Sequence, residues 1–219
     1  MIISVTSLKG GVGKSTVAQN LAVCFSHSKY KVCIVDSDTN QSAIRWSGLR
    51  DESKPKVPVF GLPDGSSLAA NIRALNIDYD IVLIDGTPSL SKLTSKIILL
   101  ADLLIIPILP SGLDVWATEQ FIERYNDACE QKESKIPAYF LLNRFKPNTN
   151  FSKEVREVLP ETGIPVLSNV LKDRVAYTEA VVQGSGVFEY KDDKAKDEIA
   201  NLYNEIISII KDLTKNKQS

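Results

Sequence analysis

Cysteine and histidine are scarce in this chain of 219 residues, which contains three cysteines and one histidine. Cys24, Cys33 and Cys129 show no C-x-x-C spacing and are odd in number, so the sequence indicates neither a zinc site nor a disulfide framework. Free cysteines fit a reducing compartment, and the N-terminus lacks a basic region followed by a cleavage site. We therefore expect a cytoplasmic protein.

A strong charge imbalance and a long apolar run are also missing. Lys and Arg total 26 against 27 Asp and Glu, so the composition contains no strongly basic domain that would indicate nucleic acid. No apolar run approaches the roughly 18 residues that span a bilayer. Hydrophobic residues make up 43% of the chain, which is enough to bury a full core. We expect one domain over residues 1–219.

Short runs rich in Ile, Val and Leu alternate with longer amphipathic segments. The clearest runs are IISV (2–5), KVCIVD (31–36), YDIVLID (79–85), LLIIPI (103–108) and AYFLLN (138–143). Such runs are typical of buried parallel strands. Helix-like segments lie between and after them, at residues 14–25, 90–100, 113–133 and 192–213. The alternation predicts an α/β fold, a doubly wound, mostly parallel sheet flanked by helices. Residues 51–65 are expected to form a surface connection with at most one short strand, VPVF (57–60).

The stretch SLKGGVGKST, residues 7–16, follows the first predicted strand and opens the first predicted helix at Lys14. Gly10, Gly11 and Gly13 permit positive φ and let backbone N–H groups, Val12 included, point at phosphate oxygens, while the helix N-terminus adds the positive end of its dipole. The stretch departs from the P-loop pattern GxxxxGK[ST] at its first glycine position only. A glycine-rich turn that merely joins strand to helix is the alternative interpretation.

Three side chains of this P-loop have expected roles. Lys14 would bind the β- and γ-phosphates of ATP, the Ser15 hydroxyl would bind Mg²⁺, and Thr16 would donate near the α-phosphate. Thr16 also stands where a dinucleotide-binding GxGxxG would need glycine, which argues against a Rossmann cofactor site.

The stretch KGGVGKST resembles the deviant P-loop (deviant Walker A) of the ParA/MinD family of ATPases. VDSDTNQSAIRW (35–46) resembles the D-x-D-P-Q segment of that family, IVLIDGTPSL (81–90) its Walker B strand and switch, and LLNR (141–144) its adenine-facing segment. GVFEY and the final long helix complete a resemblance that covers nearly the whole chain. The likeness is closest to the small, plasmid-type ParA proteins without an N-terminal DNA-reading domain. We expect none here, because the first predicted strand begins at Ile2.

The resemblance implies roles for three carboxylates and one amide. Asp38 would position the attacking water, Asp36 would lie near the metal, Asp85 would bind Mg²⁺ through water, and Asn143 would contact adenine. A plainer interpretation exists for three of them: Asp36 and Asp38 could simply end a strand, and Asn143 could be a turn residue. Two acids one residue apart at the carboxyl edge of a parallel strand favour the functional interpretation.

Lys9 is a second lysine beside a phosphate cradle that needs only one. It could be an exposed loop residue, but the resemblance implies that it reaches across a nucleotide sandwich dimer to the partner's phosphates, as an arginine finger does. Lys9, Lys14 and Asp38 are therefore the candidate catalytic residues. Lys9 would make dimerisation depend on ATP.

The function that the resemblance implies is a partition ATPase. It would hydrolyse ATP slowly with Mg²⁺ and form a homodimer with ATP. The dimer would bind DNA nonspecifically on the nucleoid and segregate plasmid or chromosomal DNA. A ParB-like adaptor that stimulates hydrolysis would release it. The alternatives are a MinD-like membrane switch, a cargo-positioning ATPase acting on a protein assembly, and a same-fold biosynthetic enzyme. Glu205 and Asp212 dilute the apolar face of the last helix, so we expect that face to pack on the sheet and to bind no membrane.

The DNA-binding surface has the weakest sequence signal. Lys172 and Arg174 lie in a segment where relatives carry basic residues, although a basic run of this size is usually a solvated face. Lys211, Lys215 and Lys217 lie near the end of the chain. His27, Trp46 and Trp116 are expected to be surface or packing residues.

Overall fold

The computed structural model describes residues 1–62, 67–89, 91–110, 115–147, 155 and 158–216. Leu90, Leu113 and Lys217, which the sequence interpretation used, lie outside these ranges, and so does the side chain of Trp116.

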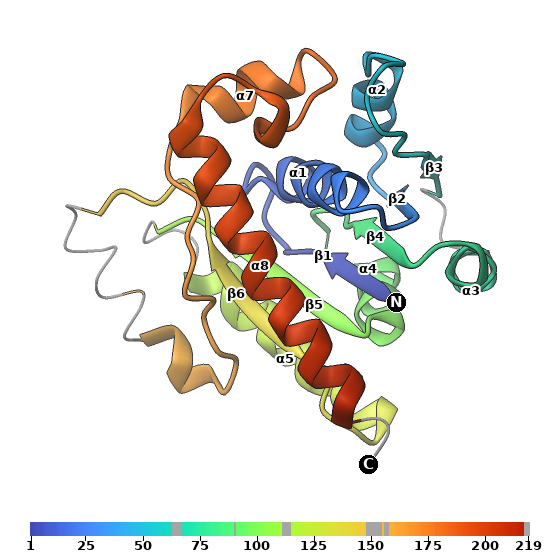
Figure 1. Cartoon of the computed structure of the whole chain (residues 1–219). Helices are drawn as coiled ribbons and strands as arrows, with labels where there is room; N and C mark the ends of the chain where they lie inside the picture. The colour runs from blue at the N-terminus through green and yellow to red at the C-terminus, as the bar shows by residue number, and fades with distance from the viewer. Residues whose placement is uncertain (63–66, 90, 111–114, 148–154, 156–157, 217–219) are drawn as a thin grey trace.

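A parallel sheet forms the centre of the fold (Figure 1). Within the described residues it has six strands in the order β3-β2-β4-β1-β5-β6. Their bounds are β1 Ile2–Val5, β2 Val32–Asp36, β3 Val59–Gly61, β4 Ile81–Asp85, β5 Leu103–Ile108 and β6 Ala138–Leu142. All five neighbouring pairs are parallel. The runs of Ile, Val and Leu are buried because helices cover both faces of the sheet, as the sequence predicted.

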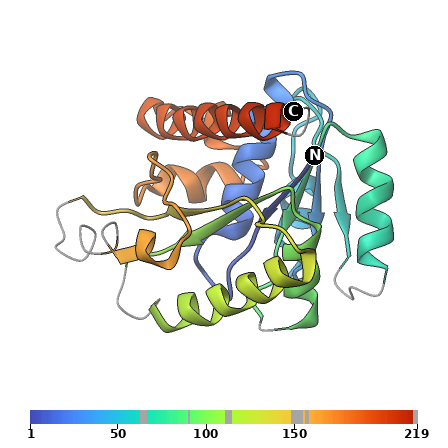
Figure 2. The ribbon, with the colours of Figure 1, turned by 90° about the horizontal axis from the view of Figure 1, so that it is seen from below.

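The helices form a layer on each face (Figure 2). One layer contains α1 (Lys14–His27), α2 (Ser42–Gly48), α7 (Val175–Val181) and α8 (Asp193–Asn216). The other contains α3 (Leu68–Asp78), α4 (Lys92–Leu100) and α5 (Val115–Lys132). Two short 3₁₀ helices, η2 (Leu159–Thr162) and η3 (Val187–Glu189), complete the described elements. The doubly wound α/β prediction is confirmed.

Among the helices in the described ranges, α2, α3 and α7 were not predicted from the sequence. α2 and α7 have seven residues each, too short for a reliable helical period, and α3 follows the Pro- and Gly-rich connection after Gly61. The short predicted strand at 57–60 is β3, shifted to Val59–Gly61.

The last helix, α8, lies beside α1 in the same layer. Ala195, Ile199, Leu202 and Ile206 recur at helical spacing and are fully buried in the core that α1 and the sheet share. Strand residues such as Ile105 and Leu141 belong to the same core, so the prediction that this apolar face packs on the sheet is confirmed. None of the helices in the described ranges is long and apolar enough to cross a membrane.

The strand order places the P-loop at a reversal point of the chain. β1 lies between β4 and β5, and the chain leaves β1 toward β2 on one side and reaches β5 on the other. Ligands of open parallel sheets bind in the crevice outside the carboxyl ends of the strands at such a point. Val5, Asp36 and Asp85 end their strands there, in register with one another.

Candidate nucleotide site

A cavity of about 380 Å³ opens at the carboxyl end of β1. It brings together seven residues predicted from the sequence: Gly10, Gly11, Gly13, Lys14, Ser15, Thr16 and Asp38. The sequence interpretation missed its other lining residues, Gln19, Asn40, Ser42, Pro88, Arg144 and Val181. Asn40, Ser42, Pro88 and Arg144 lie in the motif segments 35–46, 81–90 and 141–144, at positions without an expected role, and Gln19 and Val181 lie in α1 and α7. Only the folded chain reveals that these residues line the cavity.

The glycines of the loop divide into two kinds. Gly11 and Gly13 adopt positive φ, at 75° and 92°, a backbone conformation that residues with a side chain rarely adopt. A Cβ on Gly13 would also clash with Nδ2 of Asn143. Gly10 does not have positive φ and has open space around its Cα, so the prediction of a left-handed turn there was wrong. Gly10 is exposed, and it leaves the entrance of the cradle unobstructed.

Lys14 is the first residue of α1, and its side chain folds back into the loop. Its ammonium donates a hydrogen bond of 2.9 Å to the carbonyl oxygen of Lys9. Burial lowers the pKa of Lys14, while the charges of Asp85 and Asp38 oppose that shift. A buried cation is thus held at the floor of a loop that fits a phosphate anion. Lys9 is half-buried at the rim.

Asp36, at the end of β2, is fully buried and bound to backbone amides. Its Oδ1 accepts from the amide of Asp38 at 3.1 Å, and its Oδ2 accepts from the amides of Ala43 and Ile44 at 2.9 and 3.2 Å. Asp36 therefore ties the loop that carries Asp38 to the first turn of α2. Burial raises the pKa of Asp36 and these amides oppose the rise. These bonds give Asp36 an indirect part in the site, and its assignment as a metal ligand stays a prediction.

Asp38 lies in the cavity opposite the P-loop. It is 9% exposed, and its Oδ1 accepts from the amide of Asn40 at 2.9 Å. The bond fixes the carboxylate in the turn that leaves β2. A fixed carboxylate facing the cradle is suited to orienting a water molecule.

Asp85, at the end of β4, is fully buried, and neither of its carboxylate oxygens accepts a hydrogen bond within the described part of the chain. Burial raises its pKa to about 7, while the nearby Ser15 hydroxyl and the charge of Lys14 act against the shift. A buried carboxylate without a donor is costly unless a cation binds there. Asp85 and Ser15 fit a Mg²⁺ site for this reason. No group of three or more His, Cys, Asp and Glu that could hold a metal ion is found in the described ranges. Mg²⁺ in nucleotide sites usually keeps several waters and binds substrate phosphates beside one or two carboxylates.

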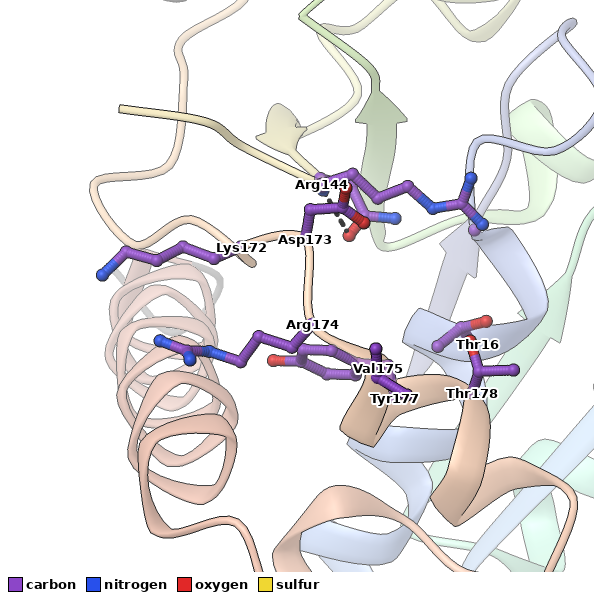
Figure 3. A pocket seen from close by; sticks show the side chains of 10 residues that line it. Thr16, Arg144, Lys172, Asp173, Arg174, Val175, Tyr177 and Thr178 are labelled. Atoms are coloured by element: carbon purple, nitrogen blue, oxygen red, sulfur yellow. Dashed lines mark hydrogen bonds between the residues drawn. The ribbon is translucent and has the colours of Figure 1, made fainter. Parts of the chain in front are cut away.

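A second cavity, of about 340 Å³, lies beside the first (Figure 3). Asn143 lines it and is 7% exposed. Its amide nitrogen donates to the carbonyl of Val12 at 2.7 Å, and its Oδ1 accepts from the amide of Arg144 at 3.0 Å. Asn143 thus braces the P-loop from the end of β6. Contact with adenine stays a prediction, and the cavity beside Asn143 has room for a base.

Lys172 and Arg174, the candidate DNA contacts, line the far side of the second cavity. Both form ion pairs with Glu198 of α8: Arg174 Nη2 lies 2.6 Å and Lys172 Nζ 3.6 Å from its Oε1. Arg174 points toward α8 in Figure 3. Part of their charge is therefore neutralised within the chain.

The remaining sequence candidates have structural roles. Trp46 is buried and donates from Nε1 to the carbonyl of Ser185 at 3.1 Å. His27 contacts the carboxylate of Glu189 at 2.8 Å, and Glu189 also binds the guanidinium of Arg50. As expected, His27 lies at the surface and Trp46 packs in the core.

A P-loop, a carboxylate that faces it and a fully buried aspartate whose oxygens accept no hydrogen bond in the described ranges lie together at the edge of a parallel sheet. This combination defines a P-loop ATPase. Residues 3–187 match the family model of the CobQ/CobB/MinD/ParA nucleotide binding domain. The chain therefore belongs to this family. It is an ATPase of the ParA/MinD type, and ATP and Mg²⁺ are its cofactors.

Individual proteins support the assignment. The chain is 31% identical to maintenance of carboxysome distribution protein A of Halothiobacillus neapolitanus, over 94% of this chain and 95% of that protein. It is 26% identical to protein ParA of Rhizobium radiobacter, over 87% of this chain and 86% of that protein. The fold of a Cyanothece apo McdA structure matches with a TM-score of 0.80 at 18% identity, over 94% of this chain and 98% of that one.

Proposed function

We propose that this ATPase is a positioning switch. ATP would dimerise it, the dimer would bind DNA nonspecifically, and a partner would end that state by stimulating hydrolysis. Homodimers and partner proteins are general in the ParA/MinD family. The observation that carries the proposal is the pair of lysines at one cradle: Lys14 fills its floor, and Lys9 stands half-buried at its rim.

Lys9 would act in trans. Two ammonium groups beside an empty cradle repel each other, whereas the phosphates of ATP would attract both. Lys14 occupies the inner position by binding the Lys9 carbonyl, which leaves the outer position for a cation that serves a neighbouring subunit. Lys9 would thus stabilise the dimer only when ATP and a second subunit are both present.

Light scattering of wild type and of Lys9→Ala, with ATP and with ADP, tests this step. We expect wild type to dimerise with ATP only and Lys9→Ala to bind ATP as a monomer. Lys29→Ala, which changes an exposed lysine in the turn after α1, is the matched control and should dimerise as wild type does. A Lys9→Ala protein that dimerises normally would exclude the trans role.

DNA binding would use the phosphate backbone. Lys172 and Arg174 are the proposed contacts, and their ion pairs with Glu198 would have to open or be shared. With ATP, the protein should bind unrelated duplexes with an affinity that falls steeply with salt. Lys172→Ala should weaken binding to all duplexes alike and reduce the salt slope by about one. Liposome binding without DNA binding would favour the MinD-like alternative, which the buried apolar face of α8 disfavours.

The cargo would be DNA or a protein assembly. A plasmid or chromosome fits the likeness to ParA, and the 31% identical relative, named for carboxysome distribution, favours an assembly. The adaptor decides between them. A protein encoded beside this gene that stimulates the ATPase and binds a specific DNA sequence would identify DNA as the cargo. An adaptor that stimulates hydrolysis but binds a protein shell instead would identify an assembly.

A further inference from the structure

Arg144 lies where the two cavities of the nucleotide site meet. Only three residues line both cavities within the described ranges, namely Gly13, Thr16 and Arg144. The first cavity contains the cradle for the β- and γ-phosphates, and the second has room for a base. The part of a nucleotide that joins these positions is the α-phosphate with its ribose.

The side chain of Arg144 is directed to this junction. In Figure 3 it extends from the end of β6 toward the P-loop, whereas Arg174 extends the opposite way toward α8. Arg144 is exposed, and no ion pair with it is found in the described part of the chain, in contrast to Lys146, Lys172 and Arg174. The guanidinium is therefore available to an anion that enters the cavity.

The backbone holds Arg144 in this place at a conformational cost. Its φ is 49°, in the left-handed region that residues with a Cβ rarely adopt. The amide of Arg144 donates to Oδ1 of Asn143, and the next amide, that of Phe145, donates to the carbonyl of Leu171 at 2.9 Å. Strain of this kind persists where neighbouring contacts impose it, and it is concentrated at binding sites.

We propose that Arg144 binds the α-phosphate of the nucleotide within its own subunit. A planar guanidinium can donate two hydrogen bonds to one phosphate group, and such charge-assisted bonds are strong. Thr16, on the other side of the junction, would donate to the same phosphate. Because Asn143 binds both the Val12 carbonyl and the Arg144 amide, the cation and the P-loop are held in one hydrogen-bonded unit.

Calorimetric titration of ADP and of a nonhydrolysable ATP analogue, with Mg²⁺, tests the proposal. Arg144→Ala should weaken both nucleotides by a similar factor, about tenfold to a hundredfold, since both carry the α-phosphate. Lys146→Ala is the matched control, because Lys146 is exposed on the same segment and pairs with Asp173. It should bind both nucleotides within about twofold of wild type.

A second variant separates ligand binding from a structural role. Arg144→Gly removes the side chain and suits the left-handed backbone, so it should raise the melting temperature of the nucleotide-free protein by about 2–4 °C while it weakens ADP binding. Arg144→Lys should retain part of the affinity because it keeps the charge without the planar fork.

Several results would overturn the proposal. Unchanged ADP affinity in Arg144→Ala would do so, and so would a loss confined to the ATP analogue, which would place the guanidinium at the γ-phosphate. An equal loss in Lys146→Ala would indicate a general charge effect. Loss of DNA binding with normal ADP affinity would make Arg144 a DNA contact instead. None of these readouts with ADP depends on dimerisation or on the cargo.

Discussion

The side-chain amide of Asn143 donates a hydrogen bond of 2.7 Å to the carbonyl oxygen of Val12, and it thereby joins the end of β6 to the P-loop. The two residues are 131 positions apart in the sequence. Because the bond is buried, the carbonyl has no access to water if the amide is removed. The shape of the phosphate cradle therefore depends on the last strand of the sheet.

Replacing Asn143 tests this dependence. Asn143→Ala should lower the free energy of unfolding by about 1–2 kcal/mol, since it leaves the Val12 carbonyl buried without a donor. Urea denaturation measures the effect. Asn71→Ala is the control. It removes an exposed hydrogen bond of 3.0 Å from the Asn71 amide to the Ser67 hydroxyl, and it should lower the free energy of unfolding by only a few tenths of a kcal/mol. Equal losses in both variants would contradict a bracing role for Asn143.

The two kinds of glycine in the P-loop should respond differently to alanine. Gly13→Ala places a Cβ against Asn143 at a φ of 92°, so we expect a lower melting temperature and weak ADP binding. Gly10→Ala meets open space without positive φ and should melt within about 1–2 °C of wild type. Differential scanning calorimetry of both nucleotide-free proteins distinguishes them. A Gly10→Ala protein that is as unstable as Gly13→Ala would be inconsistent with the open space around Gly10.

Asp85 should make stability depend on pH. Burial raises its pKa to about 7 in the folded protein, above the value of about 3.9 expected for the unfolded chain. Between these values the folded state binds more protons than the unfolded state, so the nucleotide-free protein should lose stability as the pH rises from about 4 to about 7. Asp85→Asn should abolish this pH dependence and raise the free energy of unfolding at pH 8 by about 1–3 kcal/mol.

Chemical denaturation at several pH values measures the difference between Asp85→Asn and wild type. Asp78→Asn, at an exposed carboxylate on α3, is the control and should follow the wild-type curve. Asp85→Asn should also lose Mg²⁺-dependent hydrolysis, because the amide carries no charge for the metal. A difference curve without any slope between pH 4 and 7 would mean that Asp85 is not proton-linked to folding.

Lys14 should be needed for ATP binding, whereas Asp38 should be needed for ATP hydrolysis. Lys14→Ala should lose ATP binding, because the phosphate charge is left uncompensated in the cradle. Asp38→Ala should keep ATP binding and slow hydrolysis by about a hundredfold or more, as expected for a group that positions water. Nucleotide titration combined with single-turnover hydrolysis separates the two effects. A similar loss of nucleotide affinity in both variants would remove Asp38 from the catalytic role.

The sequence by itself determined the parallel strands, the helices α1, α4, α5 and α8, and the P-loop. These features depend on patterns within a few residues: runs of Ile, Val and Leu that both sheet faces bury, helical periodicity, and glycines spaced around Lys14. Asp85 ends a predicted strand and Asp38 lies two residues after the end of another, so the strand pattern also points to both positions, whereas their roles came from the family resemblance.

Only the tertiary structure decided which distant residues meet at the site. The strand order brings β6 beside β5, so that Asn143 and Arg144 reach a loop that lies more than 120 residues earlier in the chain. It also places Glu198 of α8 against Lys172 and Arg174, which reduces the charge that the sequence alone assigned to that segment. Such contacts join segments with no shared local pattern, and the free energy of packing the whole chain selects them.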